Sequence, residues 1–426
     1  MEQKFSDRYV RLRHKVNLGK KKMVNYDLIF AVIFYGLILL FILRNKKDFQ
    51  FQGKIIALYR TKLGLNAMDR LAKILPPVWK FLGVISVIFG FAGMGFIFWW
   101  LLKGTFNLLF VPDSMPAVAP VLPGINVPGL PALSFWHWVI GIFLVAAVHE
   151  FSHGIFARLY GIKVKSSGFV LFGPILGAFV EPDEKQMFKK KKMQQLAVLS
   201  AGAFSNLVMG VVFLLLLNFA FNPLMDKFYE ADGIKIKQIV DGSPADIMGL
   251  EAPLILKEVN GYKTINSSDF LKATAELKPG DETKLITDKG DFTLILVENE
   301  KNKSRGYMGV SDFEINTKIK EAAEAEYGIF IPKFVLWITM LSFWLFIINV
   351  GIGLFNLLPL GPLDGGKMFY LLALTLCRNN QTKAHRLWGV VSFLGFMFIM
   401  INLLPFIIKL LIFLAKPFLF LISMLV

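Results

Sequence analysis

Long apolar runs constrain the fold of this chain more than any other feature of its sequence. An α-helix crosses the hydrocarbon core of a bilayer with about 20 apolar residues, and lipid tolerates only helices or closed barrels as spanning structures. Of the 426 residues, 55% are hydrophobic and 42 are phenylalanine, which is more apolar surface than a soluble globule can bury. We therefore predict a polytopic α-helical membrane protein with about six spans, at residues 28–43, 78–102, 135–160, 195–221 and 332–358 and within 387–426. The last range fits either one span with an interfacial helix or two tight spans.

The charged residues lie between these apolar runs. The net charge of +16 comes from lysines and arginines gathered in loops, which agrees with the positive-inside rule and with anionic lipid headgroups rather than with nucleic acid. We expect the basic loops at 161–192 and 367–386 to be cytoplasmic, and the nearly uncharged Pro/Gly segment at 103–134 to lie on the other face without helix. Parity then puts the amino terminus outside, although residues 1–26 are themselves basic.

Several segments differ from spanning helices. Phe169–Val180 is apolar but too short and too rich in glycine to span, so we predict a β-hairpin or re-entrant loop. Residues 44–77 are basic with helical periodicity, and Asn222-Pro223 should end the fourth span. In residues 226–325, charges of both signs appear and strand-like runs alternate with turns, which predicts one small extramembrane α+β domain. The expected division is 1–77 for a basic amino-terminal region with the first span, 78–225 and 326–386 for two parts of a catalytic membrane core, 226–325 for the inserted domain, and 387–426 for carboxyl-terminal hydrophobic helices.

The third predicted span contains an H-E-x-x-H motif. His149 and His153 are four residues apart, so on a helix they lie on one face, where two imidazoles can hold one zinc ion. The adjacent carboxylate of Glu150 can take a proton from a zinc-bound water. Chance matches to this motif are common in soluble helices, but here two of only five histidines lie in an apolar run. Ionisable groups at membrane depth are costly and usually functional, so we predict a metal site inside the membrane, nearer its cytoplasmic surface.

A catalytic zinc requires a third protein ligand and an open position. The only cysteine is Cys377, which excludes a thiolate-rich site. Asp364 is the strongest candidate because it follows the fifth span directly and precedes Gly365-Gly366, which would let the backbone approach the metal. An ordinary Asp-Gly turn is the alternative interpretation. Glu181 and Asp183 are weaker candidates, since Pro182 and further charges indicate a wetter loop.

Four motifs together resemble the site-2 protease family of intramembrane metalloproteases. They are H-E-F-S-H at 149–153, G-A-F-V-E-P-D-E at 177–184, S-A-G-A-F-S-N at 200–206 and N-L-L-P-L-G-P-L-D-G-G at 356–366. The inserted domain resembles the PDZ domains that many members carry, through G-S-P-A at 242–245, V-N-G at 259–261 and G-Y-M-G-V at 306–310. The resemblance covers most of residues 80–385. One departure is Gly202-Ala203, where members often have Gly-Pro.

The resemblance implies a cofactor, a reaction and a set of site residues. Zn²⁺ would be held by His149, His153 and Asp364, with Glu150 as general base and with Asn206 and Asn356 near the substrate strand or the oxyanion. The reaction would be hydrolysis of peptide bonds within or near transmembrane segments of membrane-anchored proteins, that is, regulated intramembrane proteolysis. The partners would be a substrate transmembrane helix, the lipid bilayer and a peptide or protein segment at the PDZ-like domain. The protein would be a multi-pass protein of the cell membrane with its PDZ-like domain on the non-cytoplasmic side.

Two other functions are compatible with the same motifs. A membrane-tethered zincin would cut soluble or misfolded proteins at the surface, and such enzymes usually take their third ligand from a glutamate on a later helix. A transporter or scaffold would use the His/Glu/Asp set as a metal site or proton relay without any proteolysis.

Overall fold

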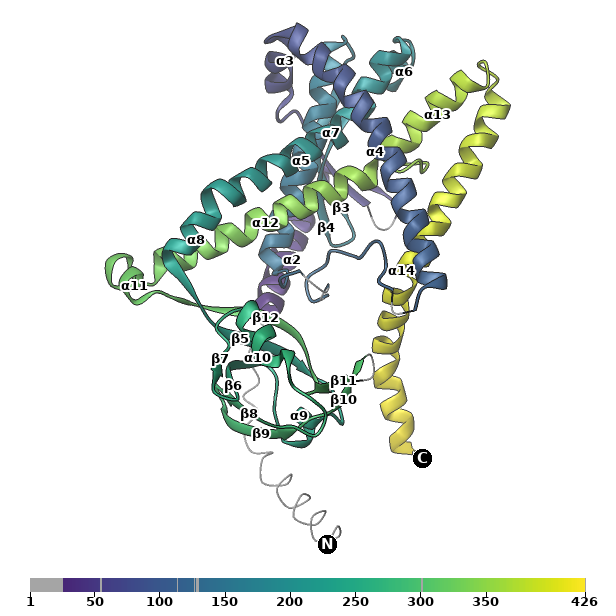
Figure 1. Cartoon of the computed structure of the whole chain (residues 1–426). Helices are drawn as coiled ribbons and strands as arrows, with labels where there is room; N and C mark the ends of the chain where they lie inside the picture. The colour runs from purple at the N-terminus through teal and green to yellow at the C-terminus, as the bar shows by residue number, and fades with distance from the viewer. Residues whose placement is uncertain are drawn as a thin grey trace.

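The computed structural model describes residues 26–53, 56–112, 114–125, 127, 130–299 and 302–425. The basic arm predicted for the first 25 residues lies outside the described residues. Within the described part, six helices are long and apolar enough to cross a membrane. They are α2 (Tyr26–Arg44), α4 (Pro76–Phe110), α5 (Phe135–Leu159), α7 (Lys192–Leu216) with its continuation, α12 (Phe330–Asn356) and α14 (Gln381–Leu425) (Figure 1). The predicted class, a polytopic helical membrane protein, is confirmed.

Several helix ends differ from the sequence prediction. The fourth span does not end at Asn222-Pro223: a π-helical turn (η1, Leu217–Phe221) leads into α8 (Asn222–Phe228). Pro223 therefore lies within one continuous helix, and the π-helical turn directly before it is where the regular hydrogen-bond pattern changes. Residues 367–386 are not a loop, because most of them belong to α13 (Asp364–Leu376) and to the start of α14. The carboxyl-terminal region forms one continuous helix rather than two spans.

The Pro/Gly segment is non-helical only after α4 ends at Phe110, eight residues later than the predicted start at 103. It is held against the helices by side chains from the membrane core. Asn402 on α14 accepts a hydrogen bond from the Ala117 N–H at 2.8 Å and donates to the Thr105 hydroxyl at 2.9 Å. The indole N–H of Trp138 donates to the Val121 carbonyl at 2.9 Å. These bonds satisfy backbone polar groups that lipid could not.

The predicted hairpin is present, as β3 (Val164–Phe172) and β4 (Ile175–Pro182), but it belongs to a larger sheet. The strand order is β1-β2-β3-β4, all antiparallel, with β1 (Phe49–Gln52) and β2 (Ile56–Thr61) contributed from far upstream. The helical periodicity expected over 44–77 is therefore correct only for α3 (Leu65–Lys73) and the start of α4. β4 is an edge strand of this sheet and lies against α5.

The inserted domain is a β-rich unit at one end of the molecule, opposite α3 and α6 (Glu184–Phe188) (Figure 1). Its sheet runs β12-β5-β6-β8-β9, with β7 paired to β6. The strands are β5 (Tyr229–Ile239), β6 (Leu254–Val259), β7 (Tyr262–Lys263), β8 (Glu282–Thr287), β9 (Gly290–Ile295) and β12 (Val310–Ile319); α9 (Pro244–Ile247) and α10 (Ser267–Ala275) accompany them, and β10 (Val297–Asn299) pairs with β11 (Asn302–Tyr307). A separate apolar core that includes Ile236 and Leu285, both fully buried, supports the predicted small α+β domain.

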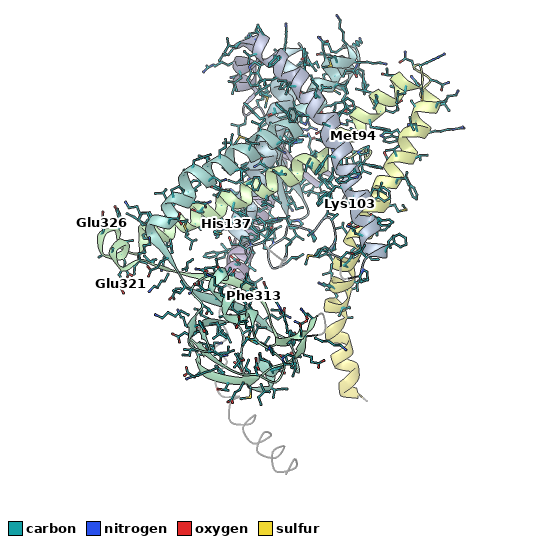
Figure 2. All side chains as sticks on the ribbon, viewed as in Figure 1. Met94, Lys103, His137, Phe313, Glu321 and Glu326 are labelled. Atoms are coloured by element: carbon teal, nitrogen blue, oxygen red, sulfur yellow. The ribbon has the colours of Figure 1, made fainter. Side chains whose placement is uncertain are left out.

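The helices of the membrane core approach one another closely at small residues. A Cβ on Gly353 of α12 would lie 3.2 Å from the Ala203 carbonyl oxygen and 3.3 Å from Cβ of Asn206, both on α7. Such small residues allow helices in lipid to pack backbone against backbone. The carboxyl-terminal end of the inserted domain leads back to the membrane helices through α11 (Glu321–Tyr327), which precedes α12. Figure 2 shows the side chains of this arrangement, including Met94 of α4, which is buried in one apolar core with residues of α7 and α13.

Candidate active site

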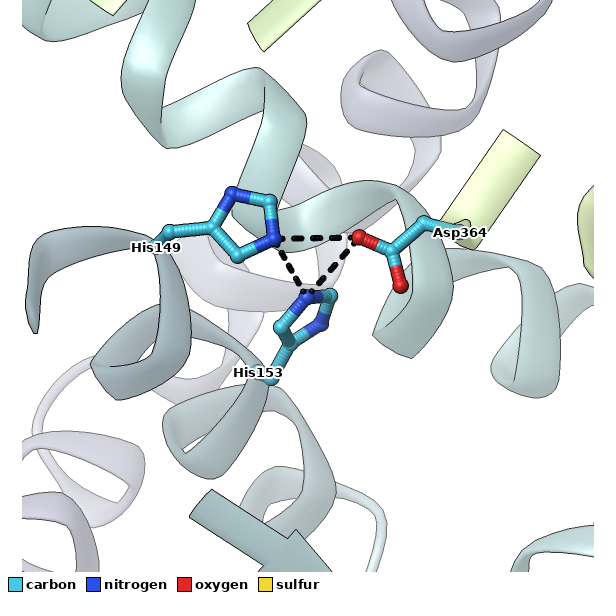
Figure 3. Close-up of side chains that lie close together, drawn as sticks. All are labelled: His149, His153 and Asp364. Atoms are coloured by element: carbon cyan, nitrogen blue, oxygen red, sulfur yellow. Dashed lines mark hydrogen bonds and ion pairs between the residues drawn. The ribbon is translucent and has the colours of Figure 1, made fainter. Parts of the chain in front are cut away.

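Three side chains from distant parts of the chain converge on one point. His149 and His153 come from adjacent turns of α5, and Asp364 is the first residue of α13. The two Nε2 atoms are 3.1 Å apart, and each lies 3.1 Å from Oδ2 of Asp364 (Figure 3). His149 and His153 are only 6% and 8% exposed. The structure thus brings together all three residues that the sequence suggested as zinc ligands.

The contacts around the cluster show how its atoms can face a cation with lone pairs. Nδ1 of His153 lies 2.6 Å from the carbonyl oxygen of Val198, which can only accept, so Nδ1 carries a proton, and in the neutral ring Nε2 then presents a lone pair. The facing carboxylate oxygen of Asp364 is also an acceptor. With Nε2 of His149 also in its lone-pair form, the three acceptors repel one another unless a cation or a shared proton lies between them. Two ligands of a tetrahedral zinc, each about 2.0–2.1 Å from the ion, lie roughly 3.3 Å apart, so the cluster fits zinc and leaves a fourth position.

Gly202 of α7 provides the space in which the cluster sits. A Cβ on this residue would fall within 3.0 Å of the Nε2 atoms of both His149 and His153. Any other amino acid would therefore press on the metal-binding atoms. The sequence analysis noted Gly202 only as a departure from the family pattern and missed this role. Its four-residue spacing from Asn206, which places both on one helix face, was the available signal.

The glycines after Asp364 act differently from the prediction. A Cβ on Gly365 would fall within 3.0 Å of the Leu357 carbonyl, and one on Gly366 within 3.0 Å of the Leu360 carbonyl. They allow the first turn of α13 to pack on the turn that follows α12, rather than letting the backbone approach a metal. This packing is what places the Asp364 carboxylate over the two histidines.

Glu150 faces a cavity shared with the cluster. The cavity has a volume of about 770 Å³, and its lining includes His149, His153 and Asp364. Oε2 of Glu150 accepts a hydrogen bond from the backbone N–H of Val180 at 3.0 Å. Because Val180 lies on β4, the candidate catalytic base is hydrogen-bonded to the edge strand of the four-stranded sheet β1-β2-β3-β4.

The two asparagines of the resemblance lie in different places. Asn356, at the end of α12, lines the cavity. Asn206 on α7 is fully buried and is not among the cavity-lining residues. Its amide lies 3.0 Å from Nδ1 of His149, on the side of the ring away from Asp364.

The weaker ligand candidates do not join the cluster. The Glu181 carboxylate accepts hydrogen bonds from Arg60 and Ser166. Burial raises the pKa of Glu181, but these two hydrogen bonds and the charge of Arg60 outweigh it, so the pKa lies below its ordinary value. Asp183 caps α6 by accepting from the Gln186 N–H at 3.1 Å. His137, labelled in Figure 2, is another buried histidine of α5; it bonds Ser134 and the Trp337 carbonyl and is not part of the cluster.

A histidine pair and a carboxylate that open onto a cavity inside a bundle of membrane helices are the ligand set expected of a membrane-embedded metal-dependent hydrolase. The comparison with protein families agrees: residues 137–402, well over half of the chain, match Peptidase family M50. The chain belongs to this family. It is therefore a zinc metalloprotease of the site-2 type and a multi-pass membrane protein.

Individual proteins resemble the chain as follows. An uncharacterized protein of Methanocaldococcus jannaschii is 31% identical over 359 residues, which cover 82% of this chain and 85% of the relative. The zinc metalloprotease RasP of Shouchella clausii is 22% identical over 265 residues, covering 52% of this chain and 60% of that protein. Among solved structures, the PDZ domain of an SdrC-like protein from Listeria monocytogenes covers 19% of this chain and 86% of its own, with 22% identity and a TM-score of 0.17.

Proposed function

We propose that this protease hydrolyses peptide bonds within or next to a transmembrane segment of a membrane-anchored protein, with His149, His153 and Asp364 as the zinc ligands. The observation that carries the proposal is the triangle of two imidazole nitrogens and one carboxylate oxygen with 3.1 Å sides, placed between membrane helices and open to a cavity. Imidazole nitrogen and carboxylate oxygen are ligand atoms that zinc prefers, and their spacing fits a tetrahedral zinc ion.

Glu150 is the general base of the proposed reaction. Zinc, when bound, lowers the pKa of a water molecule and polarises the scissile carbonyl. The Glu150 carboxylate faces the cavity beside the cluster, so it can take a proton from the attacking water and pass it to the leaving amine. Asn356 lines the same cavity, and its amide N–H can donate to the oxyanion as charge develops.

The edge of β4 is the proposed docking site for the substrate backbone. A helical segment hides its carbonyl groups in hydrogen bonds, so it must unwind locally before hydrolysis. An extended segment can then pair with an exposed strand edge, which supplies the backbone partners that lipid lacks. Phe179, Val180 and Glu181 of β4 line the cavity, so a strand paired there would pass the metal cluster.

The charges support one orientation in the membrane. Lys189–Lys192 lie at the start of α7, and Arg378, Lys383 and Arg386 lie where α13 meets α14. Both groups are at the end opposite the inserted domain (Figure 1). The positive-inside rule assigns that end to the cytoplasm. We accordingly propose that the PDZ-like domain, 226–325, lies on the non-cytoplasmic side and screens a peptide or protein segment of the substrate. Residues 78–225 and 326–386 are then the two parts of the catalytic core, with 1–77 before them and 387–426 after.

The test is zinc analysis of the purified full chain together with cleavage of a substrate that has a single transmembrane helix. Glu150→Gln should keep zinc and lose cleavage, and Asp364→Ala should lose both. Cleavage by Glu150→Gln would remove Glu150 as the base. Full zinc occupancy in Asp364→Ala would favour a membrane-tethered zincin with another third ligand. Bound metal without cleavage of any membrane-anchored protein would favour the transporter or scaffold.

A further inference from the structure

One face of α7 lies along the two histidines of α5. Val198, Gly202 and Asn206 are spaced four residues apart, so they share one helix face. Val198 contacts His153 through its carbonyl, Gly202 adjoins both imidazoles, and Asn206 contacts His149. None of the three supplies a candidate zinc ligand.

The contact to His153 fixes the protonation of that ring. Its Nδ1 must donate to the Val198 carbonyl at 2.6 Å, which directs the lone pair of Nε2 toward the cluster. The Nε2 of His149 faces the same cluster, at 3.1 Å from the Asp364 carboxylate. For His149 to bind zinc through Nε2, its Nδ1 must carry the hydrogen, and the group facing Nδ1 must accept it.

Asn206 is the group that faces Nδ1 of His149. The Asn206 side chain is fully buried, and its amide is 3.0 Å from Nδ1. With the amide nitrogen turned to the ring, Oδ1 is buried without a hydrogen-bond partner, and two N–H donors would oppose each other in a zinc-bound site. An asparagine amide can present either end, and only the oxygen end pairs with Nδ1–H.

We infer that Asn206 is a positioning residue of the zinc site, whose amide oxygen accepts the Nδ1–H of His149. This bond fixes the tautomer and orientation that leave the Nε2 lone pair for zinc. The inference rests on the proposed ligand set and replaces the oxyanion or substrate role that the family resemblance implied for Asn206. The absence of Asn206 from the cavity lining agrees with it.

The experiment measures zinc affinity of the full-length protein in detergent by competition with a zinc chelator. Asn206→Leu keeps a similar shape but removes the acceptor, and loss of such an outer partner weakens metal binding by roughly 10–100-fold. Asn206→Asp keeps the acceptor, so its zinc affinity should stay close to that of the unaltered protein. The visible absorption of the Co²⁺-loaded protein, which reports ligand geometry, should change in Asn206→Leu and be retained in Asn206→Asp.

Asn349→Leu is the matched control. Asn349 on α12 is 2% exposed, its Nδ2 donates to the Leu345 carbonyl at 2.7 Å, and its Oδ1 also has no partner. It contacts no histidine in the hydrogen bonds of the described chain, so zinc affinity should be unchanged. A loss as large as that of Asn206→Leu would show that any buried amide supports the bundle, and would overturn the inference.

The other outcomes also decide. If Asn206→Leu and Asn206→Asp both keep zinc affinity while kcat falls and KM is unchanged, Asn206 acts on the oxyanion and the inference is wrong. If both variants lose zinc equally, the shape of the amide matters rather than its acceptor, and the inference is again wrong. Failure of the ligand set itself is recognised separately, by full zinc occupancy in Asp364→Ala.

Discussion

The two helices that meet at the metal centre, α5 and α7, have different roles. α5 presents donor atoms, through His149 and His153. α7 presents no metal ligand. It supplies the Val198 carbonyl that fixes one ring, the space at Gly202, and the Asn206 amide that faces the other ring. A donor set alone leaves each imidazole free to choose its tautomer, whereas a neighbouring helix with the correct acceptors removes that choice. The metal site therefore depends on both helices: α5 supplies ligand atoms, and α7 orients them.

Removing a donor from α5 should have the largest effect. His153→Ala takes away one of the three lone pairs, so stoichiometric zinc binding and cleavage should be lost together. Elemental analysis and a transmembrane-substrate assay measure this. His137→Gln is the control, because His137 is a buried histidine of the same helix that bonds Ser134 and the Trp337 carbonyl instead. Full zinc content in His153→Ala would show that α5 does not supply both of the proposed histidine ligands.

Filling the space on α7 should come next. The methyl group of Gly202→Ala would lie within 3.0 Å of both Nε2 atoms, and overpacking of this kind costs about 1–3 kcal/mol. We expect zinc affinity to fall roughly 10–100-fold, measured by chelator competition. Gly95→Ala on α4 is the matched control, because a Cβ there would meet no atom within 4 Å. Equal zinc affinity in both variants would mean that α7 does not confine the site.

The difference between the two helices also explains what the sequence could show. The four-residue histidine spacing and the rarity of ionisable residues in an apolar run identify α5 without any tertiary information. Asp364 was found because a zinc site needs a third ligand and few acidic residues adjoin a span. The role of α7 was hidden, because one contact is made by the backbone of Val198 and another by a glycine with no side chain at all.

The four-stranded sheet β1-β2-β3-β4 could not be predicted from the sequence for a related reason. The pairing of β2 with β3 joins Tyr59 to Phe169, and no local pattern can reveal a partner so far along the chain. In contrast, three strand pairs of the inserted domain, β6–β7, β8–β9 and β10–β11, are joined by short connections, and this strand-and-turn pattern was visible in the sequence. Local pairing leaves a sequence signature, and long-range pairing leaves little.

β4 contacts the Glu150 carboxylate through a backbone group, much as α7 contacts the imidazoles. Val180→Pro removes the N–H that donates to Glu150 at 3.0 Å. Because this N–H points away from β3, proline is tolerated at that edge position. A hydrogen bond to a charged group contributes about 1.5–3 kcal/mol, so we expect kcat to fall about tenfold or more with zinc content unchanged.

Ala178→Pro is the control for this prediction. By strand alternation the Ala178 N–H also faces the open edge, but it makes no contact with Glu150. Its loss should raise KM, if the substrate pairs with β4, and leave kcat nearly constant. An equal fall of kcat in both variants would show that the β4 edge acts only through substrate pairing. The bond from Val180 would then have no separate role in positioning Glu150.

The smallest effect on zinc is expected at Val198, which distinguishes a main-chain contact from a side-chain contact on α7. Val198→Ala removes buried methyl groups from a side chain that is 2% exposed, so the protein should become less stable by about 1–2 kcal/mol. The carbonyl that accepts from His153 remains, so zinc affinity should stay within about threefold, far from the roughly 10–100-fold loss expected for Asn206→Leu. Thermal unfolding without zinc and chelator competition measure the two quantities separately. The backbone contact to His153 does not depend on the Val198 side chain. A zinc affinity that falls together with stability in Val198→Ala would therefore mean that α7 acts by general packing.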